Sequence, residues 1–276
     1  YGVISLRRAF EVSSNTGIVK LVYKEFKDRP EDFVDFLYRR GVHEKTGVSI
    51  KGETAPTIPK PTDGSWSGLT LPWMAYGYSL SMTLLQLLTF YNAVANDGKM
   101  VQPQVVERIM DHGRVVEQYE TKVLNQAICS EATIDKLQVL LEGVVERGTA
   151  MNIRDKRIQL AGKTGTCQMN YWRGKTKDYQ SSFAGYFPAD KPRYSCIVVI
   201  SKPDYRLGYY GNVVAGPVFK SIADEVYSQM PQEPILVDAE ALDRSPASHS
   251  IPGVHVLLGD EVPEDTGLLL LSRCVP

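Results

Sequence analysis

Three strand-like segments close together in the second half of the chain limit its fold more than any other feature. One leads from Ile158 through Leu160 into AGKTGTC, and the others cover 182–187 and 194–201. They are rich in apolar and β-branched residues, and the connection at 188–192 is short, so antiparallel pairing is the natural arrangement. Helical spacing returns over 213–230. The pattern predicts an antiparallel sheet with a helix packed on one face.

The first half of the chain is mainly helical in its spacing. Four helices are predicted, after Gly17, from about Pro30, over 84–95, and from Ser130 to Gly148. Residues 42–75 are rich in Gly, Pro, Thr and Ser and predict a long irregular loop. Short strands are predicted at 101–106 and 115–119, with a turn at 111–113 between them.

Composition argues against several classes of function. Lys and Arg total 31 against 32 Asp and Glu, for a formal net charge of -1, so no basic field would hold nucleic acid. No apolar run reaches the roughly 18 residues that a membrane span needs. The four cysteines form no C-x-x-C pair and have no histidine at ligand spacing, so neither a metal nor a cofactor is expected.

The stretch AGKTGTC at 161–167 is the first candidate site. A phosphate-binding P-loop needs a glycine five positions before Gly162, where this chain has Arg157, and needs a helix where this chain continues a strand. The other interpretation is the K-T-G strand of penicillin-interacting enzymes, which forms one wall of an acyl-transfer cleft. We therefore favour acyl transfer over nucleotide binding.

Each residue of the K-T-G stretch suits one part of that chemistry. The Lys163 ammonium supplies positive potential for a substrate carboxylate and for nearby proton transfers, and the hydroxyls of Thr164 and Thr166 can hydrogen-bond the carboxylate. Gly165 leaves room for the substrate backbone to lie against the strand. The backbone N–H of Thr166 would be one of two donors to a developing oxyanion.

A second candidate motif lies 150 residues upstream of Lys163. SSNTG at 13–17 has the S-x-N arrangement in Ser13 and Asn15, with helices between it and the K-T-G strand. A helix N-cap explains the same residues equally well, because Ser and Asn satisfy free N–H groups at the start of a helix. Both interpretations stay open at this point.

Six segments together give the chain a family resemblance. They are 13–15, 163–166, YGYSLSMTLLQLLTFYNAVANDGKMVQP at 76–103, GVVERGTA at 143–150, SSFAGYFPADKPRY at 181–194 and AGPVFKSIADEVY at 215–227. From residue 1 to about 229 the chain resembles the transpeptidase domain of a class B penicillin-binding protein of the FtsI-type division branch. The resemblance implies an α+β fold, an antiparallel sheet flanked by helices as in serine β-lactamases. It also implies that Ser13 relays protons to the leaving amine and that Asn15 orients the substrate and the catalytic lysine.

The family's first motif, S-x-x-K, is absent from the 276 residues. It supplies the nucleophilic serine and the lysine that takes its proton. The nearest match, Thr57-Ile58-Pro59-Lys60, cannot replace it, because proline breaks the helical turn that brings the two groups together. The motif would fall before Tyr1, so we expect a domain incomplete at its N-terminus and a chain that is not acylated.

The implied function is a peptidoglycan D,D-transpeptidase, which transfers an acyl group from D-Ala-D-Ala stem peptides and is blocked by β-lactams. The alternative is a non-catalytic scaffold of the same fold that binds peptide or divisome partners. A hydrolytic β-lactamase is disfavoured because no carboxylate for deacylation is evident. The family also implies a division glycosyltransferase as partner, an N-terminal membrane anchor in the full-length protein, and a catalytic domain on the periplasmic or extracellular side.

The remaining segments support narrower expectations. Residues 170–180 predict a hairpin over the cleft whose Tyr171, Trp172 and Arg173 touch the stem peptide, with an exposed tip as an equal alternative. Cys167 is expected to be a half-buried strand residue rather than a reactive thiol. The predicted domains are a transpeptidase domain at 1–230, a linker at 231–250, and a C-terminal tail at 251–276 in which IPGV resembles the start of a PASTA module.

Overall fold

A computed structural model describes residues 1–169 and 178–230, together with the backbone of 269–273. All three predicted peptide contacts, Tyr171, Trp172 and Arg173, lie outside the described residues, as do the linker at 231–250 and most of the tail. The domain boundary at 230 and the PASTA-like start therefore remain predictions.

The centre of the fold is a four-stranded antiparallel sheet. Its strands, in spatial order, are β5 (Ala161–Met169), β6 (Asp178–Phe187), β7 (Tyr194–Ser201) and β8 (Leu269–Arg273). The register pairs Thr164 with Phe183 and Phe183 with Val198. The first three strands confirm the antiparallel prediction, and the α+β class is confirmed with them. The sequence did not predict β8, which pairs with β7 along the edge opposite β5.

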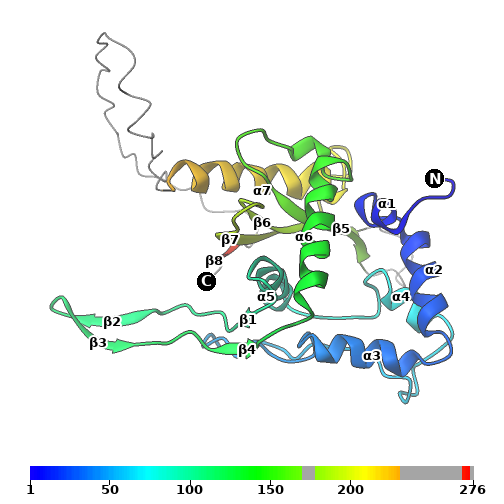
Figure 1. Cartoon of the computed structure of the whole chain (residues 1–276), viewed down its shortest axis with the longest axis horizontal. Helices are drawn as coiled ribbons and strands as arrows, with labels where there is room; N and C mark the ends of the chain where they lie inside the picture. The colour runs from blue at the N-terminus through cyan, green and yellow to red at the C-terminus, as the bar shows by residue number, and fades with distance from the viewer. Residues whose placement is uncertain (170–177, 231–268, 274–276) are drawn as a thin grey trace, which may run out of the picture.

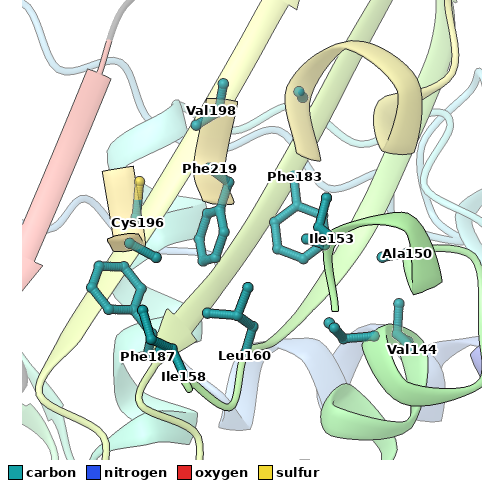
Figure 2. Packing of buried hydrophobic residues seen from close by; sticks show 13 residues of the cluster. Val144, Ala150, Ile153, Ile158, Leu160, Phe183, Phe187, Cys196, Val198 and Phe219 are labelled. Atoms are coloured by element: carbon teal, nitrogen blue, oxygen red, sulfur yellow. The ribbon is translucent and has the colours of Figure 1, made fainter. Parts of the chain in front are cut away.

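Alternation along the strands divides the core between the two faces of the sheet. On one face, Phe183 and Phe187 pack against Phe219 of α7 (Gly211–Ser228), with ring centroids 4.6 and 5.7 Å apart (Figure 2). All three phenylalanine side chains are fully buried. Cys196 and Val198 of β7 belong to the same cluster. The predicted helix over 213–230 thus covers the sheet as expected, beginning two residues earlier.

Helix α5 (Leu84–Ala95) covers the opposite face of the sheet (Figure 1). Its contacts with the strands come from apolar residues at the intervening positions, namely Leu88, Ala184, Ile197 and Val199. The helix starts with a capping box, in which the Thr83 hydroxyl accepts from Gln86 N and the Gln86 amide oxygen accepts from Thr83 N. It ends at Ala95, followed by Gly98 with φ +88°. Two helix layers with the sheet between them result.

Most of the remaining helices lie beyond the β5 edge of the sheet or below α5, whereas α6 (Glu131–Glu146) contacts β5 and the short 3-10 helix η1 (Met151–Ile153) contacts α7 (Figure 1). The others are α1 (Leu6–Glu11), α2 (Asn15–Phe26), α3 (Pro30–Arg39) and α4 (Thr70–Met74). The sequence predicted α2, α3 and α6 but not α1, which has only six residues. The loop predicted over 42–75 is irregular except at α4, whose Leu71 and Met74 pack against Phe33.

Two small sheets form an arm that projects from the body of the molecule (Figure 1). Strands β1 (Met100–Val101) and β4 (Val123–Asn125) form its base, and β2 (Arg108–Asp111) and β3 (Arg114–Gln118) form a hairpin. The predicted turn at 111–113 is confirmed, and so is the strand predicted at 115–119, which begins and ends one residue earlier, at 114–118. The predicted strand at 101–106 is wrong beyond Val101, because Pro103 cannot donate to a ladder and Gln104 bonds the carbonyls of Val106 and Tyr119 with its side chain.

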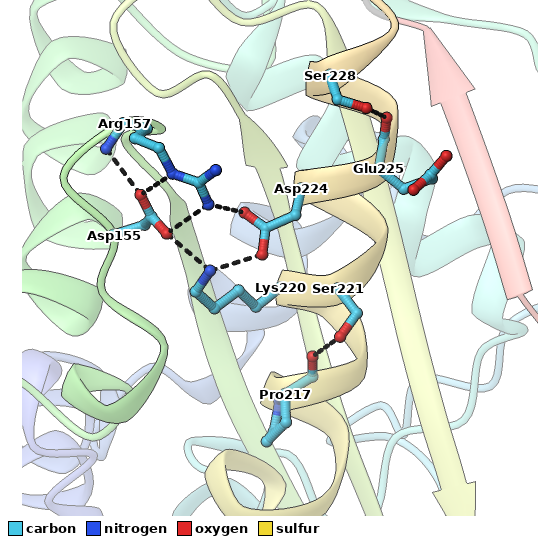
Figure 3. A network of polar contacts seen from close by, with 8 residues as sticks. All are labelled: Asp155, Arg157, Pro217, Lys220, Ser221, Asp224, Glu225 and Ser228. Atoms are coloured by element: carbon cyan, nitrogen blue, oxygen red, sulfur yellow. Dashed lines mark hydrogen bonds and ion pairs between the residues drawn. The ribbon is translucent and has the colours of Figure 1, made fainter. Parts of the chain in front are cut away.

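A network of charges holds α7 to the loop that precedes β5 (Figure 3). Asp155 and Asp224 share two cations: Arg157 lies 3.2 and 3.0 Å from them, and Lys220 lies 2.7 Å from each. Hydrogen bonds from Arg157, and then from Lys220, hold the pKa of Asp155 well below its usual range.

Candidate active site

The S-x-N segment occupies a tight junction between α1 and α2. Ser13 N donates to Phe10 O at 3.0 Å and Ser14 N donates to Ala9 O at 2.8 Å, which is the Schellman arrangement at a helix C-terminus. Ser13 occupies the left-handed position of that motif, with φ +54°, where glycine is the usual residue. A serine that accepts this conformation at a site of interest points to a requirement for its side chain.

The two interpretations of this segment apply to different residues. Ser14 is the N-cap of α2, and its hydroxyl accepts from Gly17 N at 3.2 Å. Ser13 and Asn15, on either side of the cap, line one cavity together with the K-T-G strand. The cap formed by Ser14 thus fixes the first turn of α2, and this turn places the neighbouring Ser13 and Asn15 at the cavity.

Lys163 meets the S-x-N segment directly. Its Nζ donates to Ser13 Oγ at 2.8 Å and to the carbonyl of Thr164 at 3.1 Å. The two residues are 150 positions apart, and the strand reaches Ser13 because β5 is the edge of the sheet. Burial lowers the pKa of the Lys163 amine to about 8. Near neutral pH this amine can therefore both hold and release a proton.

The two threonines of K-T-G-T face the α7 side of β5. Thr166 Oγ1 accepts from the backbone N–H of Gly211, the first residue of α7, at 3.0 Å. Its own hydroxyl hydrogen is thereby free to point at a ligand. Thr164 Oγ1 lies 2.8 Å from Thr149 Oγ1. An added Cβ at Gly211 would overlap the carbonyl oxygens of Ser182 and Gly165, so only glycine lets α7 start this close to the strand.

The outer edge of β5 offers backbone N–H groups to the cavity. Gln168 N points away from β6 and donates to Tyr78 OH at 3.0 Å. Because alternate residues of a strand turn their N–H groups to the same side, Thr166 N also points outward, toward the cavity that its residue lines. This is the orientation that an oxyanion donor needs.

Two adjoining hollows form the candidate site. One has a volume of about 450 Å³, and its lining includes the apolar residues Phe10, Ile18 and Trp73 as well as Ser13, Asn15, Lys163, Thr164, Gly165 and Thr166. The other, of about 420 Å³, shares Ser13, Asn15, Thr164 and Thr166 and extends to Thr149, Tyr179 and Tyr209. The structure therefore brings together all the predicted site residues that it describes: Ser13, Asn15, Lys163, Thr164, Gly165 and Thr166.

Two residues of the site were not singled out from the sequence. Thr149 and Tyr78 both lie inside segments that carry the family resemblance, but neither belongs to a short motif. No local sequence pattern marks these two residues, because each belongs to the site only through its contact with β5. Cys167 is half-buried and burial raises the pKa of its thiol, which agrees with a structural role.

Two kinds of feature are absent from residues 1–169, 178–230 and 269–273, the described part of the chain. There, no group of three or more His, Cys, Asp or Glu side chains is arranged to hold a metal ion. No helix within it combines the length and apolar character needed to cross a membrane.

The left-handed backbone at Ser13 leads to a first prediction. Ser13→Gly and Ser13→Ala both remove the hydroxyl that Lys163 contacts, but only glycine adopts φ +54° without strain. We expect Ser13→Gly to be more stable than Ser13→Ala by about 1 kcal/mol in urea unfolding, the cost of a left-handed residue with a Cβ. Equal unfolding free energies for the two variants would show that the junction relaxes.

The environment of Lys163 leads to a second prediction. In a pH titration followed by NMR of ¹³C-methylated lysines, the Lys163 signal should have a midpoint near pH 8. The ordinary pKa of a lysine side chain that is open to solvent is about 10.4. A Lys163 midpoint within the range of the exposed lysines would contradict the burial of its amine.

Comparison with known proteins agrees with this fold and site. An antiparallel sheet between helix layers, with a Lys-Thr-Gly edge strand facing a Ser-x-Asn junction, defines the penicillin-recognising serine enzyme fold. Residues 1–224 match the family model described as the penicillin binding protein transpeptidase domain. The chain belongs to this family.

Curated relatives give the same result. The chain is 34% identical over 225 residues to penicillin-binding protein PbpB of Mycolicibacterium smegmatis, which covers 78% of this chain and 34% of that protein. It is 28% identical to the probable peptidoglycan D,D-transpeptidase PenA of Neisseria flavescens, over 80% of this chain and 52% of that protein. The chain spans about a third of the length of the first curated relatives it matches.

Solved structures of relatives share the fold. Penicillin-binding protein 3 of Mycobacterium tuberculosis superposes with a TM-score of 0.69 at 31% identity, covering 83% of this chain and 53% of that one. The same protein has been crystallised in complex with aztreonam. The transpeptidase domain of Burkholderia pseudomallei penicillin-binding protein 3 gives a TM-score of 0.67 at 26% identity, over 84% and 68% of the two chains.

Proposed function

We propose that this chain is the part of a peptidoglycan D,D-transpeptidase that carries two of the three walls of its acyl-transfer site. The observation that carries the proposal is the 2.8 Å contact between Lys163 Nζ and Ser13 Oγ, with Asn15 in the same cavity. Homologues named peptidoglycan D,D-transpeptidases support the reaction class. The whole protein's substrate would be a stem peptide ending in D-Ala-D-Ala, and β-lactams would occupy the same site.

The proposed reaction assigns a step to each residue of the site. A serine Oγ outside residues 1–276 attacks the carbonyl carbon of the penultimate D-Ala, and its proton passes to a neighbouring amine. The Thr166 N–H stabilises the oxyanion, while Thr164 and Thr166 hold the terminal carboxylate beside the charge of Lys163. As the peptide C–N bond breaks, Ser13 relays a proton to the leaving D-Ala, and Asn15 orients the peptide. An acceptor amine then attacks the acyl-enzyme and releases the crosslinked product.

The location and the partners of the whole protein follow from the same family. We propose a catalytic domain on the outer side of the cytoplasmic membrane, with an anchor in the full-length protein. The proposed partner is a division glycosyltransferase of the shape, elongation, division and sporulation type. The relatives' names, penicillin-binding proteins and D,D-transpeptidases, support a cell-wall role.

A non-catalytic scaffold of the same fold is the second candidate. One observation favours it: the 276 residues contain no S-x-x-K sequence. The transpeptidase predicts that a form extended upstream of Tyr1 releases D-Ala from a D-Ala-D-Ala stem peptide. The scaffold predicts binding of the stem peptide with no release of D-Ala. Liquid chromatography of free D-Ala, with the 276-residue chain as the matched control, separates the two.

A further inference from the structure

Glu11 is a charged residue in a place that local preferences do not explain. Its side chain is 3% exposed, at the last position of α1. The carboxylate also lies beside Gly143, in the last turn of α6. The C-terminal ends of both helices carry negative partial charge, which disfavours an anion there. A buried carboxylate kept against these local costs implies that its specific contacts are required.

Those contacts join the end of α1 to the end of α6. Glu11 Oε1 accepts from Arg147 Nη2 at 2.9 Å, and Glu11 Oε2 lies 3.4 Å from Arg8 Nη1. Arg8 in turn donates to the carbonyl of Arg147 at 2.6 Å. The backbone takes part as well, because Thr149 N donates to Glu11 O at 3.0 Å. Three of these four contacts join two segments 136 residues apart, and the fourth, between Arg8 and Glu11, lies within α1.

Two glycines make the contact between these segments possible. A Cβ added at Gly143 would lie 2.5 Å from Glu11 Oε1 and 2.8 Å from Arg147 Nη2. A Cβ at Gly148 would overlap Glu11 O. The end of α6 is therefore shaped to receive Glu11, and the fit leaves little freedom for the residues that follow Glu11.

The locked segments lead to the two motifs of the candidate site. Two residues after Glu11 comes Ser13, in the left-handed turn that presents its hydroxyl to Lys163. Two residues after Arg147 comes Thr149, whose hydroxyl contacts Thr164 of the K-T-G strand. The Glu11–Arg147 pair is thus linked through the chain to both motifs of the site. Neither Glu11 nor Arg147 lines the cavity itself.

We propose that Glu11 is a positioning residue: its carboxylate, held by Arg147, fixes the turn that sets the Ser13 hydroxyl against the Lys163 amine. The importance of this for catalysis rests on the proposed function, but the geometry can be tested without any activity. If the pair is broken, Ser13 shifts, water reaches the Lys163 amine, and the amine titrates closer to its ordinary value.

The experiment measures the reactivity of Lys163 in the 276-residue chain. Competitive acetylation followed by mass spectrometry gives the rate and titration midpoint of every lysine at once, so the other lysines are internal standards. The variants are Glu11→Gln, which keeps the shape without the charge, Arg147→Gln, and the charge-conserving Arg147→Lys. The control is Asp224→Asn, which removes a carboxylate from the ion-pair network on α7, where it contacts Arg157 and Lys220 and no residue of the cavity.

We expect Glu11→Gln and Arg147→Gln to move the Lys163 midpoint from about 8 toward 10.5. A rise of one unit in the pKa would lower acetylation of Lys163 at pH 8 by about fivefold. Arg147→Lys should recover most of the rate, and Asp224→Asn should leave it unchanged. The proposal is overturned if Lys163 reacts normally in both glutamine variants, or if Asp224→Asn slows it as much. Arg147 is 53% exposed, so its variants decide the question if Glu11→Gln does not fold.

A second measurement separates this proposal from the proposed function. In a form extended upstream of Tyr1, the rate of acylation by a fluorescent penicillin should fall at least fivefold in Glu11→Gln and be unchanged in Asp224→Asn. If the unsubstituted extended form is not acylated, the proposed function fails, and the Lys163 readout still decides the role of Glu11. If acylation is normal in Glu11→Gln, the positioning role fails and the function stands.

Discussion

Phe219→Ala will destabilise the domain by about 3–5 kcal/mol, the cost of removing a fully buried aromatic side chain from a packed core. Phe219 has no exposed surface and contacts both Phe183 and Phe187, so it joins α7 to the sheet face on which Thr164 and Thr166 lie (Figure 2). Because Gly211 at the start of α7 donates to Thr166, loosening the helix should also disturb the site. Urea unfolding followed by circular dichroism measures the loss.

The control for this variant is the next residue back along the same helix. Val218 is 40% exposed, and Val218→Ala should cost less than about 1 kcal/mol, as surface substitutions usually do. If the two variants unfold at the same denaturant concentration, α7 does not pack on the sheet through Phe219.

Lys163→Met will lower acylation of an extended form by a β-lactam by about 10²- to 10⁴-fold, the usual contribution of a group that assists proton transfer. Methionine keeps much of the stem and removes the amine that contacts Ser13 and the charge beside the carboxylate site. The apparent second-order rate of labelling by a fluorescent penicillin measures the effect.

The matched control for Lys163 is Lys156, an exposed lysine outside both hollows of the site. Lys156→Met should be acylated at the rate of the unsubstituted protein. If Lys163→Met retained more than a tenth of that rate, the amine would have no direct part in acylation. Thermal melting of both variants checks that neither loses its fold.

The elements that could be predicted are those whose signal is local. Strands β5, β6 and β7 alternate between two covered faces, so Phe183 and Phe187 point to one helix layer and Ala184 to the other. Helix α5 has both an apolar stripe and a capping box within its own sequence. The local sequence pattern of such a segment is enough to predict its secondary structure without any tertiary contact.

The elements that were missed depend on contacts between distant residues. Helix α1 is too short to show a period and is held by the pairing of Glu11 with Arg147, 136 positions away. Strand β8 forms only by pairing with β7. The strand predicted at 101–106 failed for the opposite reason: its β-branched residues favour a strand, but Val105 and Val106 stay exposed and find no sheet to join within the described part of the chain.

The candidate site shows the same division. The K-T-G and S-x-N motifs could be read from single stretches, because each residue type has a defined chemical task. The separate roles of the two serines could not be predicted from the sequence. Ser14 forms the cap and Ser13 takes a left-handed conformation, and both outcomes depend on how α1 ends. Thr149 and Tyr78 gain their roles only through β5, which their own neighbours in sequence do not reveal.

The most direct test of the whole account is to locate a penicillin adduct by mass spectrometry. The 276-residue chain should form no adduct, because its Ser13 assists a nucleophile that these residues do not supply. A form extended upstream of Tyr1 should carry one adduct, on a serine outside residues 1–276, and lose it when Lys163 is replaced by methionine. An adduct on Ser13, or on any other residue of the 276, would contradict the assignment of roles in this site.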